Sequence, residues 1–274
     1  MTAAGLPRGR AAARRPLRWL IAAGLLASRP ACAALEDEIQ VYLDDLDAPR
    51  EWGLEVHLNT TPSGRTTPSY PGEVVSAHGT RLTQELSYGL GGGFEAGLYL
   101  PAVIEPGGHL NLAGAKLRLK WLPVAVGAEH DGWFAGANLE LARVPERYEQ
   151  SRWGSELRLI AGRRVAGWTL GMNPVFAWAV GAGGQATPDF ELGLKAARDV
   201  ARGIALGAEY YAGLGPVDAV PGWRDQDHRL YATIDVDRAP WVFNLGVGYG
   251  LSSAADRWTV KLIVEVPLRG ASKR

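Results

Sequence analysis

The residues of this chain best suited to chemistry are carboxylates and imidazoles placed at every second position. Glu55 and His57 stand two residues apart, so in a β-strand both side chains share one face, where such a pair can move protons. A hydrolase would also need a nucleophilic serine within reach of its histidine. None of the five histidines lies in a Gly-x-Ser-x-Gly motif, and the chain has no His-x-x-x-His or paired-cysteine metal motif. We therefore predict no enzyme, no metal and no cofactor, with His57 part of a polar interior.

The charged residues belong to stretches in which apolar and polar side chains alternate. In residues 113–121, alanine, leucine and tryptophan occupy the odd positions, and glycine, lysine and arginine the even ones. A side-chain period of two puts each set on one face of a β-strand, whereas a helix would scatter the charges around its circumference. The expected strands are residues 51–60, 81–90, 94–104, 110–121, 133–143, 153–163, 168–178, 189–200, 204–214, 227–237, 241–250 and 258–267.

The connections between these stretches tend to alternate between short and long. Residues 61–80 and 215–226 are long connections, and residues 91–93 and 201–203 are short ones. An even number of two-faced strands joined in this way is typical of an outer-membrane β-barrel. We therefore predict an all-β fold, a transmembrane antiparallel β-barrel of twelve strands over residues 51–268, with both ends in the periplasm. A soluble β-sandwich is the alternative.

The polar face of such a barrel surrounds its lumen. Both signs of charge are interleaved on this face, and charges cannot lie in a low-dielectric interior without partners or water. The pattern therefore predicts either a polar passage or a barrel filled by paired side chains. The expected lumen-lining residues are Glu55, His57, Glu85, Glu95, Tyr99, Lys116, Arg118, Lys120, Asn138, Glu140, Glu156, Arg158, Glu191, Lys195, Glu209, Tyr211, Asp235 and Lys261.

Aromatic side chains gather near the two expected ends of the strands. Amphipathic rings favour the membrane–water interface, so we predict two aromatic belts. The inner belt is expected to contain Trp52, Phe94, Trp121, Trp133, Trp168 and Trp241. The outer belt is expected to contain Trp153, Trp178, Phe190, Tyr210, Tyr249 and Trp258.

Residues 1–33 have the features of a cleaved signal peptide. A run of arginines precedes the apolar stretch Trp19–Ala27, and the small-x-small motif Ala31-Cys32-Ala33 places the mature start near Ala34. The signal contains six of the 29 basic residues and none of the 29 acidic ones, so the mature chain has an excess of six acids. This charge disfavours binding to nucleic acid. The single cysteine leaves with the signal.

Two charged segments flank the expected barrel. Residues 34–50 are acidic, and we interpret them as a periplasmic, solvated tether; a calcium site, a docking site for a periplasmic partner and a plug of the barrel mouth are alternatives. Residues 269–274 form a basic tail, so the chain lacks the terminal aromatic residue that usually directs barrel assembly. The loop at residues 61–80, rich in Pro, Ser, Thr and Gly, is expected to be exposed and not folded inward.

Three segments resemble a known group of proteins. They are residues 42–59 (YLDDLDAPREWGLEVHLN), Tyr70-Pro-Gly-Glu73 and Lys116-Leu-Arg-Leu-Lys-Trp121. They resemble a family of little-characterised proteobacterial outer-membrane proteins, which is similar to the outer-membrane transporters associated with meta-pathway phenol degradation. The resemblance implies a barrel with a transport role and carries over no catalytic residue.

These observations together predict a protein of the bacterial outer membrane, exported through its cleaved signal peptide. Its expected partners are outer-membrane lipid, the barrel-assembly machinery and a small solute. We predict a passive channel for small polar or amphiphilic solutes. A filled barrel that acts structurally or through its outer loops is the main alternative, and an outer-membrane hydrolase is the third.

Overall fold

A computed structural model describes residues 37–128, 130–180, 187–266 and 268, together with residues 1 and 2. The strands of this part are β1 (Trp52–Ser63), β2 (Thr80–Gly91), β3 (Phe94–Ile104), β4 (Leu110–Leu112), β5 (Ala115–Val124), β6 (Gly132–Arg143), β7 (Trp153–Val165), β8 (Trp168–Ala179), β9 (Asp189–Ala201), β10 (Ile204–Pro216), β11 (Asp227–Arg238), β12 (Trp241–Gly250) and β13 (Trp258–Glu265). A short 3-10 helix, η1 (Trp223–Asp225), precedes β11. The basic tail and most of the expected signal peptide lie outside the described residues.

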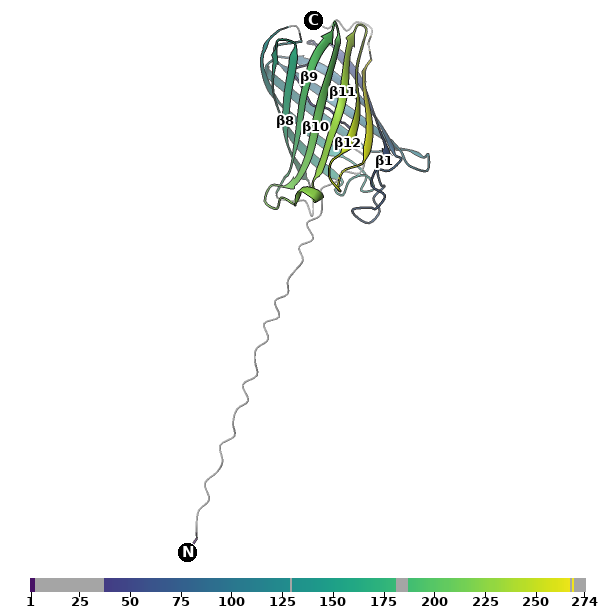
Figure 1. Cartoon of the computed structure of the whole chain (residues 1–274), viewed down its shortest axis with the longest axis vertical. Helices are drawn as coiled ribbons and strands as arrows, with labels where there is room; N and C mark the ends of the chain where they lie inside the picture. The colour runs from purple at the N-terminus through teal and green to yellow at the C-terminus, as the bar shows by residue number, and fades with distance from the viewer. Residues whose placement is uncertain (3–36, 129, 181–186, 267, 269–274) are drawn as a thin grey trace.

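The strands form one closed antiparallel barrel (Figure 1). β4 and β5 both pair with β3, so the thirteen strands fill twelve positions. The barrel closes because β1 pairs with β13 on one side and with β2 on the other, while β2 also pairs with β3. The predicted twelve-strand antiparallel barrel is therefore confirmed, with strand boundaries within three residues of those expected. Among the described residues, no helix is long and apolar enough to cross a membrane.

One predicted strand is interrupted. The expected strand 110–121 breaks between β4 and β5 at Ala113 and Gly114. Gly114 has a φ of +110°, and an added Cβ would lie 2.1 Å from the carbonyl oxygen of Arg143. A side chain does not fit this close approach of two backbones, so glycine permits the break.

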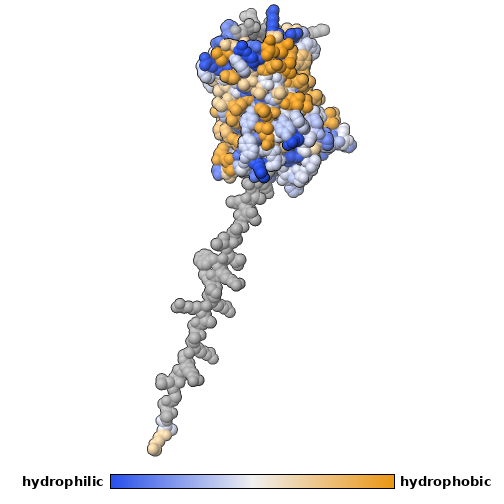
Figure 2. Space-filling view, viewed as in Figure 1, coloured by the Kyte–Doolittle hydropathy of each residue, from blue (hydrophilic) through white to orange (hydrophobic). Residues whose placement is uncertain are grey.

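Burial on the barrel is the reverse of that in a soluble protein. Leu117 and Leu139 face outward and are 59% and 54% exposed, whereas Arg118 and Lys261 face inward and are 6% and 0% exposed. Figure 2 shows apolar side chains over much of the barrel wall. A surface of this kind is stable in hydrocarbon, where a closed sheet pairs the backbone groups of neighbouring strands and has no open edge.

The aromatic residues lie at two levels set by the strand register. We call the end where β1 begins the inner end and the opposite end the outer end. Trp52 lies opposite Tyr88, and Phe94 lies opposite Trp121, all near the inner end. Tyr249 lies opposite Trp258 near the outer end. Exposed aromatic rings at the two levels are Trp52, Phe94, Trp121, Trp133, Trp153, Trp168, Trp241 and Trp258, whereas Trp178 is half-buried.

The first outer loop folds over the mouth of the barrel with its second half, so the prediction of an exposed loop is wrong for residues 73, 76, 77 and 79, whereas residues 66–69, 71 and 72 are exposed as expected. Ser76 is fully buried and Glu73 is 7% exposed. Val74 donates its backbone N–H to Arg147, between β6 and β7, and Asp256, between β12 and β13, accepts a hydrogen bond from Ser76. In the strand order these two hairpins lie on opposite sides of the barrel, so the loop spans its mouth.

A buried phenol strengthens this cover. Tyr148 is 1% exposed and packs with Val103 and Val144, while its hydroxyl donates a hydrogen bond of 2.7 Å to Glu105. Burial and the Glu105 carboxylate raise the pKa of Tyr148 to about 12. The phenol therefore stays neutral and continues to donate at any pH the cell experiences.

The outward leucines provide a test of the membrane-facing surface. Leu139 lies between the two aromatic levels, so Leu139→Arg should lower the free energy of unfolding by about 2–4 kcal/mol in lipid vesicles. The matched control Val217→Arg changes an exposed residue beyond the end of β10 and should cost less than about 1 kcal/mol. Urea unfolding followed by tryptophan fluorescence measures both, and equal effects would argue against a lipid-facing position for Leu139.

Candidate functional site: the barrel lumen

Residues 37–50, which we call the lumen segment, lie inside the barrel. Ile39, Val41 and Tyr42 are only 2–3% exposed. The prediction of a solvated tether is therefore wrong for these residues, and the alternative of a plug describes their position. The acidic composition suggested a solvated segment because the sequence does not show the cations that surround it.

The lumen segment runs along the barrel from its outer half to its inner end. Asp37 lies 2.7 Å from Lys116, near the outer end of β5. Asp47 accepts a hydrogen bond from Ser87, near the inner end of β2. The chain then turns into β1, so one extended segment occupies the lumen over most of its length.

Side chains of the barrel satisfy the backbone of the lumen segment. Asn173 on β8 accepts a hydrogen bond of 2.6 Å from the Tyr42 N–H and donates one of 3.1 Å to the Tyr42 carbonyl. Arg158 donates to the Gln40 carbonyl at 3.1 Å, and Lys261 donates to the Ile39 carbonyl at 2.9 Å. An extended segment without strand partners needs such bonds, because buried backbone polar groups are costly when unpaired.

The carboxylates of the lumen segment pair with basic residues of the barrel. Asp37 contacts Lys116 and lies 3.8 Å from Arg81. Asp44 lies 2.8 Å from Arg164 and accepts hydrogen bonds from two backbone N–H groups of residues 126 and 127. The acidic segment therefore neutralises cations that a buried lumen could not otherwise hold.

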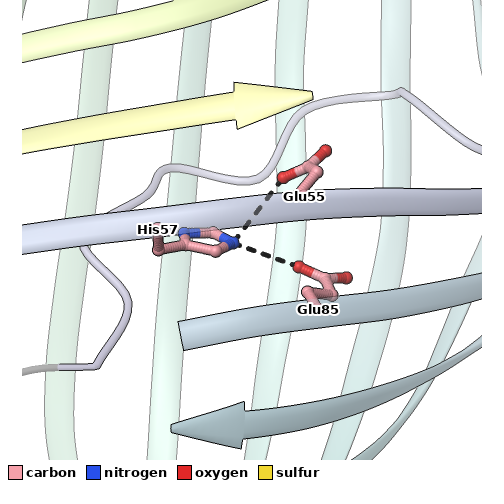
Figure 3. Close-up of side chains that lie close together, drawn as sticks. All are labelled: Glu55, His57 and Glu85. Carbon is pink, nitrogen blue, oxygen red and sulfur yellow. Dashed lines mark hydrogen bonds and ion pairs between the residues drawn. The ribbon is translucent and has the colours of Figure 1, made fainter. Parts of the chain in front are cut away.

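A compact cluster of ionisable groups joins β1 to β2. His57 Nε2 lies 3.3 Å from Glu85 and 3.7 Å from Glu55 (Figure 3). The Arg118 guanidinium reaches the other oxygen of Glu85 at 2.6 Å and also pairs with Glu95. The candidate pair Glu55 and His57 is thus joined by a second carboxylate from the neighbouring strand.

A second cluster lies on strands β9, β10, β11 and β13. Lys195 is 3.1 Å from Glu209 and 2.9 Å from Asp235, and Lys261 pairs with the other oxygen of Glu209. Glu209 therefore bridges two lysines on different strands. The Tyr211 hydroxyl also donates to Glu209 at 2.6 Å.

The structure places the remaining lumen candidates as follows. The residues expected to line the lumen and found buried are His57, Glu85, Glu95, Tyr99, Arg118, Lys120, Asn138, Glu140, Lys195, Glu209 and Lys261. Those found partly buried are Glu55, Lys116, Glu156, Arg158, Tyr211 and Asp235. Glu191 is exposed near the outer end of β9.

Several lumen residues were missed by sequence reasoning. Arg81 on β2 shares the alternation of Glu85, so the period of two was sufficient to find it. Asn173 and Arg164 also contact the lumen segment, but an asparagine and a strand-end arginine give no distinct signal. Tyr42, whose hydroxyl lies 2.7 Å from that of Tyr99, was hidden in a segment without periodicity.

A pocket of about 130 Å³ remains between the lumen segment and strands β1 and β9–β13. The pocket combines acidic and apolar side chains, and its only lysine is Lys195. The lining carboxylates are Asp45, Glu55, Glu209, Asp235, Asp237 and Glu265. The lining apolar side chains include Val41, Leu43, Val242 and Ile263. Asp237 and Val242 flank the turn between β11 and β12, so the pocket lies toward the inner end.

No family model matches the chain, and no curated protein sequence does. Among solved structures, it is similar to an outer membrane channel from Pseudomonas putida F1, with 14% identity, a TM-score of 0.53, and coverage of 82% of this chain and 99% of that one. The two chains share a barrel fold. Weaker matches include LpxR from Salmonella typhimurium, with 9% identity, 79% and 100% coverage and a TM-score of 0.40. The resemblance to a transporter family stays a prediction.

Asn173 allows the docking of the lumen segment to be tested. Asn173→Leu removes both hydrogen bonds to Tyr42 and should destabilise the docked segment by about 1–3 kcal/mol. Hydrogen exchange should therefore become faster across residues 39–46 of the folded protein. Asn244→Leu is the matched control, because the side chain of Asn244 bonds Asp235 and, among the hydrogen bonds of the described residues, makes none to the lumen segment. Unchanged exchange in Asn173→Leu would show that other contacts hold the segment.

Proposed function

We propose that the protein is an outer-membrane channel that passes small polar or amphiphilic solutes passively, and that its lumen segment controls the passage. The proposal rests on the nature of the chain segment that fills the lumen. It is a separate extended segment, held by side-chain contacts such as those of Asn173 and Lys261, and not by the pairing of strands. Movement of this segment therefore leaves the barrel closed and intact around a wider lumen.

The exterior of the barrel supports a location in the outer membrane. Outward leucines between two aromatic levels match a hydrocarbon layer with two interfaces. We propose outer-membrane lipid and the barrel-assembly machinery as partners, with export through the signal peptide expected at residues 1–33. The shared fold with an outer membrane channel is consistent with this location.

The pocket beside the lumen segment supports the proposed class of solute. Its carboxylates and apolar side chains lie together, which suits a small solute with polar and apolar parts. The excess of carboxylates over lysine favours cations over anions in the passage. A filled barrel is the second candidate, because the ion pairs of the lumen segment also suit a permanent structural role.

A reversible cross-link separates these two functions. A Cβ added at Gly193 would lie 3.5 Å from Cγ2 of Val41, so Val41→Cys with Gly193→Cys places two thiols in disulfide range. We expect the oxidised double variant to be electrically silent in a planar bilayer, because the segment cannot leave, and the reduced form to conduct like the parent protein. Single-channel recording with and without reductant measures this.

The control for the cross-link is Val41→Cys alone, which cannot form the bond within one barrel and should respond to neither oxidant nor reductant. Conduction by the oxidised double variant at the level of the parent would exclude the lumen segment as a gate. A parent protein that folds and inserts but never conducts would favour the filled barrel.

The acidic pocket predicts cation preference. Asp45→Asn with Asp237→Asn should lower the ratio of cation to anion permeability, because each charge about 10 Å from a passing ion contributes about 0.4 kcal/mol in water, or roughly a factor of two. The reversal potential in an asymmetric salt gradient measures the ratio. Asp225→Asn, in the exposed helix η1, should leave the ratio unchanged. Equal reversal potentials in all three proteins would place the pocket outside the passage.

A further inference from the structure

The carboxylates near the inner end of β1 face one another across neighbouring strands. Glu55 lies directly opposite Glu85 on β2 and directly opposite Glu265 on β13, which makes a row of three glutamates. Like charges at opposed positions of an antiparallel pair are destabilising. A cation between them removes this repulsion, and His57 on the same face of β1 lies next to two of the three.

The basic residues nearby pair with Glu95 and with the other oxygen of Glu85. Arg118 contacts Oε1 of Glu85 and also pairs with Glu95, and Lys120 lies 3.4 Å from Glu95. In the described part of the chain, Glu55 has no lysine or arginine within 4.0 Å, and its ion-pair partner is His57 at 3.7 Å. Oε2 of Glu55 and Oε2 of Glu85 therefore both face the imidazole without a permanent cation between them.

We propose that Glu55, His57 and Glu85 bind one divalent transition-metal ion of the Zn²⁺ type. Their three ligand atoms lie within 4.8 Å of one another (Figure 3). Metal–ligand bonds of about 2.0–2.2 Å place neighbouring ligands of a tetrahedral ion about 3.4 Å apart. His57 Nε2 already lies 3.3 Å from Glu85 and 3.7 Å from Glu55, so small side-chain movements form the site.

The donor set selects the class of ion. One imidazole nitrogen and two carboxylate oxygens suit Zn²⁺ and related divalent ions, whereas Ca²⁺ prefers six or more oxygens and Cu⁺ prefers sulfur. Arg118 holds the second oxygen of Glu85, which fixes the carboxylate as a partner outside the coordination sphere does in metal sites. Three protein ligands leave a fourth position for water or a solute group.

The site also has an access path. His57 is fully buried, and the Glu85 side chain is 4% exposed, but the Glu55 side chain is 27% exposed and lines the acidic pocket. The other carboxylates of that pocket attract cations toward Glu55. An ion from the inner side therefore reaches Glu55 through this pocket.

Calorimetry with Zn²⁺ and visible absorption with Co²⁺ test the site on the mature, folded protein in detergent micelles after treatment with a chelator. We expect one ion per chain and a Co²⁺ spectrum typical of tetrahedral coordination. His57→Gln and Glu55→Gln should each weaken binding about 10-fold or more. His228→Gln is the matched control, because His228 is also buried but lies beside Gln226 and Tyr210, away from the cluster.

Heat-modifiable electrophoretic mobility shows which variants fold. If His57→Gln does not fold, Glu55→Gln decides, since its side chain is partly exposed and its replacement keeps the shape. Absence of a single Zn²⁺ site in the parent protein would overturn the proposal. So would parental affinity in both cluster variants, or loss of binding in His228→Gln.

Discussion

The interior of this barrel depends on the rule that a buried charge needs a partner. Lys261 is fully buried on β13, and its ammonium group pairs with Glu209 and donates to the Ile39 carbonyl. Removal of Glu209 would take away the carboxylate that pairs with this ammonium group, and an uncompensated buried charge is far more costly than the pair itself is stabilising. The same ammonium group thus joins two strands of the barrel to the lumen segment, so wall and segment are stabilised together.

The acidic character of the lumen segment follows from the same rule. The inward faces of the strands present Lys116 and Arg164 to the lumen, where both side chains are largely buried, and Asp37 and Asp44 neutralise them. In the proposed open state, water would solvate these cations instead. The charges would then be satisfied by ion pairs in one state and by hydration in the other, as a moving segment requires.

The fold could be predicted from the sequence because its signal is local. A period of two over each strand fixes which side chains face the lumen, and this was sufficient to place Arg118 and Glu140 there; the register of the structure puts them at opposed positions of β5 and β6. The lumen segment has no period, and its contacts are distant in sequence; Tyr42 and Asn173 are 131 residues apart. From the sequence alone, its acidic residues suggest a solvated tether, because the sequence does not show which cations surround them.

The cluster of Glu55, His57 and Glu85 could be predicted from the sequence only in part. Its first half, Glu55 and His57, was visible as one face of one strand, but its second half required the register of β1 against β2 across the loop at residues 64–79. That register puts Glu55 opposite Glu85, an arrangement that sheet stability alone disfavours. Two facing carboxylates and an imidazole beside an acidic pocket form an arrangement that a bound cation would stabilise.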